Sequence, residues 1–241
     1  MKSILIIAKR ELGSYFDSLI AYIMLILFLG FSGFFTWLQG SDVFLINQAT
    51  LRPFFSIAYW TLFFFIPALT MRLLAEEKKT GTIELLLTKA ITDRQVVAGK
   101  FIAALSLIAF ALLLTLPYVI TVASIGNLDL GEVICGYLGL LLMSATYISI
   151  GLYSSSLTNN QIVAFLISLF VGLFFHIIFD VLKGSATGFI GEIFSMLSLS
   201  THFESISRGV VDSKDILYFL SLIFLGLFLT ETSLSKRKVV G

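Results

Sequence analysis

Long apolar runs alternate with short polar intervals along this chain. Each run has about the 20 residues that a helix needs to cross a bilayer, so the pattern predicts six membrane spans. Their approximate limits are residues 19–38, 54–74, 101–125, 133–157, 162–182 and 216–234. The fourth run is diluted by small residues such as Gly136, Gly139 and Gly151. Small residues allow close helix packing in lipid, so we expect this span in the interior of a helical bundle.

The first residues have a different pattern. Within residues 2–17, Ile4, Ile7 and Leu12 fall roughly on one side of a helix, and charged residues decorate the other. Such an amphipathic helix lies in the membrane interface rather than crossing it; the alternative is a frayed beginning to the first span. The short apolar run does not resemble a signal peptide, because charge returns at Lys9.

The interval between the second and third runs concentrates charge that the rest of the chain avoids. Thr80, Gly81 and Thr82 predict a break after the second span, and Thr82 can cap a second, short helix. The apolar side chains of that helix are Ile83, Leu85, Leu86 and Leu87; the charged residues of the interval include Glu76, Glu77, Lys78, Lys79, Glu84, Asp93 and Arg94. A short amphipathic helix ringed with charge between two spans suits the docking of a soluble partner.

Residues 183–215 form the longest interval on the other side of the predicted membrane. Apolar pieces are broken by polar ones, and none is long enough to span. We expect one or two short helices that dip into the outer leaflet, with their ends buried by protein. A plain external loop is the alternative.

Composition sets the class. The chain has 241 residues, of which 58% are apolar and 13% charged, with a mean hydropathy of +1.00; soluble domains carry about 25% charged residues. The chain is therefore expected to be an all-α integral membrane protein. A net charge of +1 gives no clustered basic face for nucleic acid. Cys135 is the only cysteine, and the sequence has no phosphate-binding loop, so we expect no metal, cofactor or bound ATP.

Lysine and arginine set the orientation. With the N-terminus in the cytoplasm, the inner segments hold 12 of the 16 cations. The outer segments hold only Arg52, Lys183, Arg208 and Lys214. Both termini, residues 72–100 and the short polar link at Ser154–Gln161 are therefore expected to be cytoplasmic.

His176 and Asp180 are candidates for intramembrane chemistry. They are four residues apart in the fifth span, so in an α-helix they share a face, and ionisable residues in spans are often functional. A proton relay is one interpretation. The other is that Asp180 lies near water while His176 bonds to it or to a neighbouring helix. Pro67 and Pro117 predict kinks in the second and third spans, which would act either as hinges or as static shape.

Four stretches carry a family resemblance. They are residues 76–88 (EEKKTGTIELLLT), 93–100 (DRQVVAGK), 199–215 (LSTHFESISRGVVDSKD) and 229–237 (LTETSLSKR). Together they resemble ABC-2-type transporter permeases, over essentially the whole chain. Within that family the chain is most similar to the gliding-motility permeases of Bacteroidetes. It is also similar to the permeases for copper-site maturation of nitrous oxide reductase.

The resemblance implies a permease without enzymatic activity of its own in the bacterial inner membrane. Two such permeases, identical or paired with a related subunit, would sit over two cytoplasmic ATPase subunits and drive export or translocation, linked to gliding motility. Residues 76–94 would be the coupling helix, and Ser155–Gln161 a smaller contact. The implied coupling residues are Glu76, Glu77, Lys78, Lys79, Thr82, Ile83, Glu84, Leu86, Leu87 and Arg94.

The substrate cannot be assigned from these residues. The spans carry few polar groups, which fits a lipid-linked or amphipathic substrate, or force transmission without a solute. Two other classes stay open: a membrane scaffold that anchors a machine and moves nothing, and an intramembrane enzyme that uses His176 and Asp180.

Overall fold

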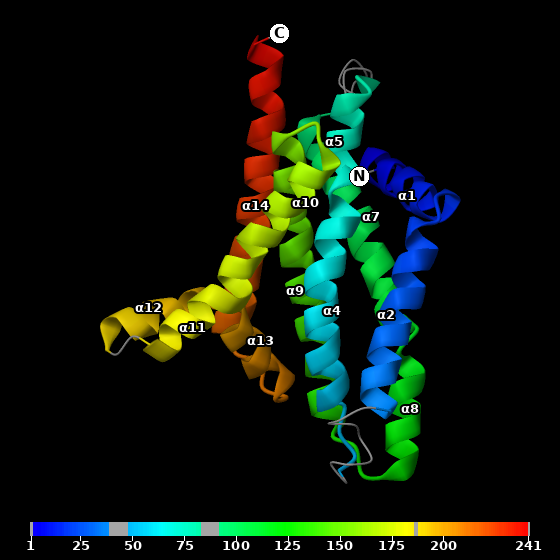
Figure 1. Cartoon of the computed structure of the whole chain (residues 1–241), viewed down its shortest axis with the longest axis vertical. Coiled ribbons are helices and arrows are strands. Elements are labelled where there is room, and N and C mark those ends of the chain that lie inside the picture. The colour runs from blue at the N-terminus through cyan, green and yellow to red at the C-terminus, as the bar shows by residue number, and fades with distance from the viewer. Residues whose placement is uncertain (1, 39–47, 83–91, 186–187, 241) are drawn as a thin grey trace.

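The computed structural model describes residues 2–38, 48–82, 92–185 and 188–240, and all regular structure in these ranges is helical. Figure 1 shows the arrangement. The helices are α1 (Lys2–Asp17), α2 (Ile20–Trp37), α4 (Arg52–Thr70), α5 (Arg72–Lys79), α7 (Asp93–Leu113), α8 (Leu116–Ile125), α9 (Leu130–Leu157), α10 (Gln161–Leu173), the π-helix η1 (Phe174–Ile178), α11 (Phe179–Ser185), α12 (Phe189–Leu197), α13 (Leu199–Ser207) and α14 (Ser213–Val240).

Six helical stretches are long and apolar enough to cross a membrane, as the hydropathy pattern predicts. They are Ile20–Trp37, Arg52–Lys79, Asp93–Ile125, Leu130–Leu157, Gln161–Ser185 and Ser213–Lys236. The all-α integral membrane architecture is therefore confirmed. The longer stretches extend beyond the predicted runs because polar turns at their ends continue the same helices.

α9 is the central helix of the bundle. It packs against α4, α7, α10, α13 and α14, and 72% of its apolar window is buried, against 17–56% for the other five stretches. Two glycines permit the close approach of α4: a Cβ at Gly136 would overlap the Phe55 ring, and one at Gly151 would overlap Thr70. The expected interior position of the fourth span is confirmed.

α1 is a separate helix rather than a frayed beginning of α2. It ends at Asp17, and α2 begins at Ile20. Figure 1 shows α1 lying across one end of the bundle, at an angle to α2. It packs mainly against α7, with Tyr15 and Ile7 among its buried side chains.

The two prolines predicted to lie inside spans have different effects. Pro67 lies inside α4, which continues to Thr70, and Met71 separates α4 from α5. Pro117 occupies the first turn of α8, where proline fits without losing a helical bond, and the break with α7 lies just before it, at Leu114 and Thr115. The third span is therefore two helices, α7 and α8.

Residues after the fifth span form two short helices, α12 and α13, instead of a plain loop. Figure 1 shows α11 and α12 projecting sideways from the bundle and α13 returning beside α9, level with the lower half of α4. The two short helices predicted before the last span are therefore present, and the alternative of a plain loop is wrong; their depth in the outer leaflet stays a prediction.

The link expected at Ser154–Gln161 begins later than the sequence indicates. α9 continues to Leu157, and Ser154, Ser155 and Ser156 are buried. The predicted helix break after the second span is present, because α5 ends at Lys79 and Gly81 has φ 71°. Of the coupling residues, Ile83, Glu84, Leu86 and Leu87 lie outside the described residues.

Candidate functional site

Lys100 is the centre of a charged cluster between α1, α5 and α7. Its side chain is 1% exposed, and its Nζ lies 2.8 Å from Glu77 Oε1 and 3.3 Å from Glu11 Oε1. Arg10 adds a second cation, 2.6 Å from Glu11 Oε1 and 3.7 Å from Glu77 Oε1. A buried charge is tolerated only when it is paired, so this cluster fixes the three helices to one another.

The charges of the cluster shift the pKa of Glu11, which lies on α1. Burial alone would raise the pKa of its carboxyl, but the nearby charges of Lys100 and Arg10 outweigh burial. The pKa of Glu11 is therefore held below its ordinary value of 4.5.

Ser155 ties α9 to the beginning of α5. Its Oγ accepts hydrogen bonds from the backbone N–H groups of Leu74 (3.0 Å) and Ala75 (2.9 Å) and donates to the Met71 carbonyl oxygen (2.9 Å). Lys78 adds a bond from its ammonium to the Ser156 carbonyl oxygen. The end of α9 thus satisfies backbone groups that the junction between α4 and α5 leaves open.

The six described coupling residues divide into two groups. Glu76, Lys79, Thr82 and Arg94 are exposed. Glu77 and Lys78 instead turn toward neighbouring helices, Glu77 to Lys100 and Lys78 to α9. The exposed group is available to a partner, whereas Glu77 and Lys78 connect α5 to the bundle.

A second site lies around His176, on the π-helix η1. The imidazole is 2% exposed and is stacked between the rings of Tyr59 (centroids 4.1 Å apart) and Phe63 (4.4 Å). Tyr59 also stacks on Phe203 of α13 at 4.8 Å. Four rings from three elements thus form one continuous stack.

Hydrogen bonds fix the orientation of this stack. The hydroxyl oxygen of Tyr147, on α9, lies 2.6 Å from His176 Nδ1. Ser200 of α13 donates to the His176 carbonyl oxygen at 2.6 Å, so the Tyr59 hydroxyl, 2.6 Å from Ser200 Oγ, is the donor of that pair. His176 Nε2 is buried and has no partner among the described residues.

His176 and Asp180 do not bond to each other as their spacing suggests. The π-turn between Phe174 and Ile178 changes the register, and Asp180 pairs with Lys183 instead, at 3.1 Å. The interpretation in which His176 bonds to a neighbouring helix is the one that the geometry supports. Both side chains nevertheless line one cavity of about 470 Å³ between α4, η1, α11 and α13.

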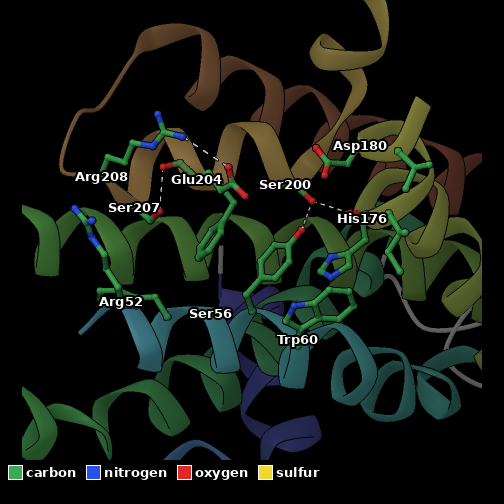
Figure 2. A pocket seen from close by; sticks show the side chains of 14 residues that line it. Arg52, Ser56, Trp60, His176, Asp180, Ser200, Glu204, Ser207 and Arg208 are labelled. Atoms are coloured by element: carbon green, nitrogen blue, oxygen red, sulfur yellow. Dashed lines mark hydrogen bonds and ion pairs between the residues drawn. The ribbon is translucent and has the colours of Figure 1, made fainter. Parts of the chain in front are cut away.

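Charged side chains of both signs surround this cavity. Figure 2 shows Arg52 and Arg208 on one side of the view, Asp180, His176 and Trp60 on the other, and Glu204 between them. Arg52 Nε donates to Glu132 Oε1 at 2.7 Å, and Arg208 lies 3.7 Å from Glu204 Oε2. Among the described residues, no group of three His, Cys, Asp or Glu side chains could hold a metal ion.

A family model identifies the protein class. The model of the ABC-2 family transporter protein matches residues 5–206. The chain belongs to this family. A comparison with curated proteins gives no match.

As an ABC-2 permease, the chain is a membrane component of an ABC transporter, and an ABC ATPase is the general partner of such permeases. The match begins within the first turn of α1 and ends near the end of α13. It therefore contains the Lys100 cluster and most of the cavity beside His176, whereas Ser207 and Arg208 of that cavity lie just beyond it.

The sequence of the permease did not identify Lys100 or the partners of His176 as site residues. Lys100 reads as the polar edge of the third apolar run, and nothing local links it to Glu77, 23 residues earlier. Tyr59 fits the outer boundary of its span, and Tyr147 is one of the few polar groups in the spans, so neither indicates a partner. The structure brings both to His176: Tyr59 stacks on its ring and the Tyr147 hydroxyl bonds to Nδ1.

Proposed function

We propose that this permease is driven by a cytoplasmic ATPase that docks on the end of α5 and on residues 82–94. One observation carries the proposal: α5 is fixed to α1 and α7 through Lys100, and to α9 through Ser155. A push on α5 would therefore be transmitted to the central helix, because α5 can move alone only by breaking these contacts with α1, α7 and α9.

The proposed contact combines exposed charge with an apolar anchor. Glu76, Lys79 and Arg94 are exposed and suit charged contacts. Thr82 and Glu84 would add polar contacts, and Ile83, Leu86 and Leu87 would supply the anchor, since a few buried residues usually dominate an interface. Glu77 and Lys78 have an internal role in this scheme.

In the proposed orientation, this end of the bundle would lie in the cytoplasm of a bacterium, at its inner membrane. Twelve of the 16 cations fall on the proposed inner side. Figure 1 shows the N-terminus, α5 and the C-terminal end of α14 at the same end of the molecule, which supports cytoplasmic positions for both termini.

In the proposed cycle, ATP brings two ATPase subunits together beneath two permeases. The second permease is either another copy of this chain or a related subunit. Movement of α5 shifts the pair between two arrangements, and ligand binding at a distance biases which arrangement is populated. A pathway between the permeases opens in one arrangement and closes in the other, which gives export or translocation.

The cellular role that fits the resemblance best is gliding motility, with copper-site maturation as the alternative branch. A scaffold that anchors a machine without moving a solute is the competing class. It needs partners but no ATPase-coupled cycle, so the two classes differ in whether an ATPase depends on the α5 end.

The test is a pull-down of the detergent-solubilised permease from its own host. Wild type is compared with the double variant Glu84→Lys, Leu86→Asp and with Lys214→Gln, an exposed cation at the predicted outer side. We expect an ABC ATPase to copurify with wild type and Lys214→Gln and to be lost from the double variant. If no ATPase accompanies any of the three, the coupling proposal is wrong and the scaffold becomes the better interpretation.

A further inference from the structure

We propose that the cavity beside His176 binds the headgroup of a zwitterionic phospholipid, a phosphate ester that carries an ammonium group. The proposal names the ligand class for the permease and therefore rests on the proposed transport function for its biological role. Binding itself requires no ATPase and can be measured separately.

The size and position of the cavity suit a headgroup that enters from the side. Its volume is about 470 Å³, within the roughly 300–1,000 Å³ of small-molecule pockets. It is lined by the first turns of α4 and by α13, which Figure 1 shows beside the bundle rather than beyond its end. A lipid in the membrane can reach such a site without leaving the bilayer.

The charges of the lining point to a ligand with no net charge. Two arginines and two carboxylates line the cavity: Arg52, Arg208, Asp180 and Glu204. A simple anion would meet the carboxylates, and a simple cation would meet the arginines. A ligand with one negative and one positive group can pair its negative group with an arginine and its positive group with a carboxylate.

Glu204 lies beside Arg208, but Asp180 lies apart from both arginines, so the cavity has a guanidinium side and a separate carboxylate side. Figure 2 shows both arginines away from Asp180 and Trp60. The arginine side suits the phosphate, because a guanidinium presents several donors to phosphate oxygens. Arg52 uses its Nε for Glu132, and its two terminal nitrogens bond to none of the described residues; its side chain is 69% exposed.

The opposite side suits the ammonium group. The Asp180 side chain is 44% exposed although it pairs with Lys183, so one face of the carboxylate remains accessible. Trp60 is 44% exposed and lines the same cavity, and an indole face attracts cations. Charge and aromatic surface thus favour an ammonium at this side.

His176 supplies an independent observation. Its side chain is almost fully buried in the cavity wall, Nδ1 is taken by Tyr147, and Nε2 has no partner among the described residues. Buried polar atoms are normally hydrogen-bonded. An oxygen atom of the ligand, or a water bound with it, would give His176 Nε2 a hydrogen-bond partner.

The experiment uses the full-length chain, purified in detergent and delipidated, in a Trp37→Phe background so that Trp60 is the only tryptophan. Fluorescence is followed during titration with short-chain phosphatidylethanolamine, with phosphatidylglycerol of the same chain length, and with free phosphoethanolamine. We expect saturable binding of phosphatidylethanolamine and weaker binding of the other two.

Variants test each end of the cavity. Arg208→Gln and Asp180→Asn should each weaken phosphatidylethanolamine binding about tenfold, since each loses a charge-assisted contact. Arg208 and Asp180 are both partly exposed, so these variants are expected to fold. Lys214→Gln and Glu192→Gln are the matched controls, exposed charges outside the cavity lining, and should bind as wild type does.

Three results would overturn the proposal. Equal binding of phosphatidylglycerol without dependence on Asp180 would make the cavity an anion site. Equal binding of free phosphoethanolamine would place the ligand in solution rather than in the membrane. Absence of saturable binding would show that the cavity does not bind this lipid. If binding fails while an ATPase still copurifies, the ligand class is wrong and the coupling proposal stands; the reverse result refutes only the coupling.

Discussion

Lys100 Nζ lies 2.8 Å from Glu77 Oε1, and the lysine side chain is buried. The pair joins α7 to α5, and Glu11 of α1 completes it at 3.3 Å. Lys100 is the buried cation of this cluster, whereas the second cation, Arg10, is half-exposed. Removal of Lys100 should therefore be far more damaging than the removal of an exposed lysine.

We predict that Lys100→Met lowers the free energy of unfolding by roughly 3–5 kcal/mol, because it leaves two largely buried carboxylates close together with only the half-exposed Arg10 to neutralise them. Denaturant unfolding of the purified permease in detergent measures the change. Lys79→Met is the control: Lys79 is exposed on α5, so its effect should stay within about 0.5 kcal/mol. Equal stability of the two variants would show that the cluster does not hold the helices.

Glu11 gives the cluster a pH dependence. Because its pKa is lowered in the folded chain, the carboxyl binds a proton less readily when folded than when unfolded. It therefore stabilises the fold above its ordinary pKa of 4.5, and this contribution is lost as pH falls below that value through the folded pKa. Melting temperatures of wild type and Glu11→Gln should differ at neutral pH and converge under acid. A difference that stays constant down to pH of about 3 would contradict the assignment.

Ser155 should be more important than the serine beside it. Ser155→Ala leaves the Leu74 and Ala75 N–H groups and the Met71 carbonyl without the hydroxyl that bonds them. A buried polar group that loses its partner costs about 1–3 kcal/mol, so we expect a loss of at least that size. Ser154→Ala is a matched control, since the Ser154 hydroxyl donates to the Ile150 carbonyl of its own helix. Similar unfolding curves for the two variants would argue against the junction.

The bond between Tyr147 and His176 can be tested by a double-mutant cycle. Tyr147→Phe removes the hydroxyl that lies 2.6 Å from Nδ1 and leaves both imidazole nitrogens without a partner among the described residues. Adding His176→Phe to this variant should cost less than His176→Phe alone, with a coupling energy of about 0.5–3 kcal/mol. Strictly additive effects on unfolding would mean that the bond contributes nothing to the position of η1.

The spans were predictable because lipid imposes a simple requirement on sequence. A helix must remain apolar for its whole crossing, so each span appears as an uninterrupted run. The interior position of α9 was also readable, since Gly136 and Gly151 mark where another helix approaches. The break at Gly81 followed from turn chemistry alone.

The candidate sites were only partly predictable, for a physical reason. A sequence shows which residues are charged but not which way they turn, so Glu77 reads like Glu76 although one faces Lys100 and the other is exposed. Helical spacing predicted a shared face for His176 and Asp180, but that argument assumes 3.6 residues per turn. His176 lies inside a π-turn, where it stacks on Tyr59 and bonds to Tyr147.

That π-turn also influences the direction of α11, the helix that follows it directly. A wider turn accommodates one residue more than an α-helix would, and each residue rotates a helix by about 100°. Deleting one residue from Phe174–Ile178 would restore a regular helix and rotate Asp180 and Lys183 by about 100° around the axis of that helix. One additional residue in this turn is thus sufficient to set the direction in which α11 leaves the bundle.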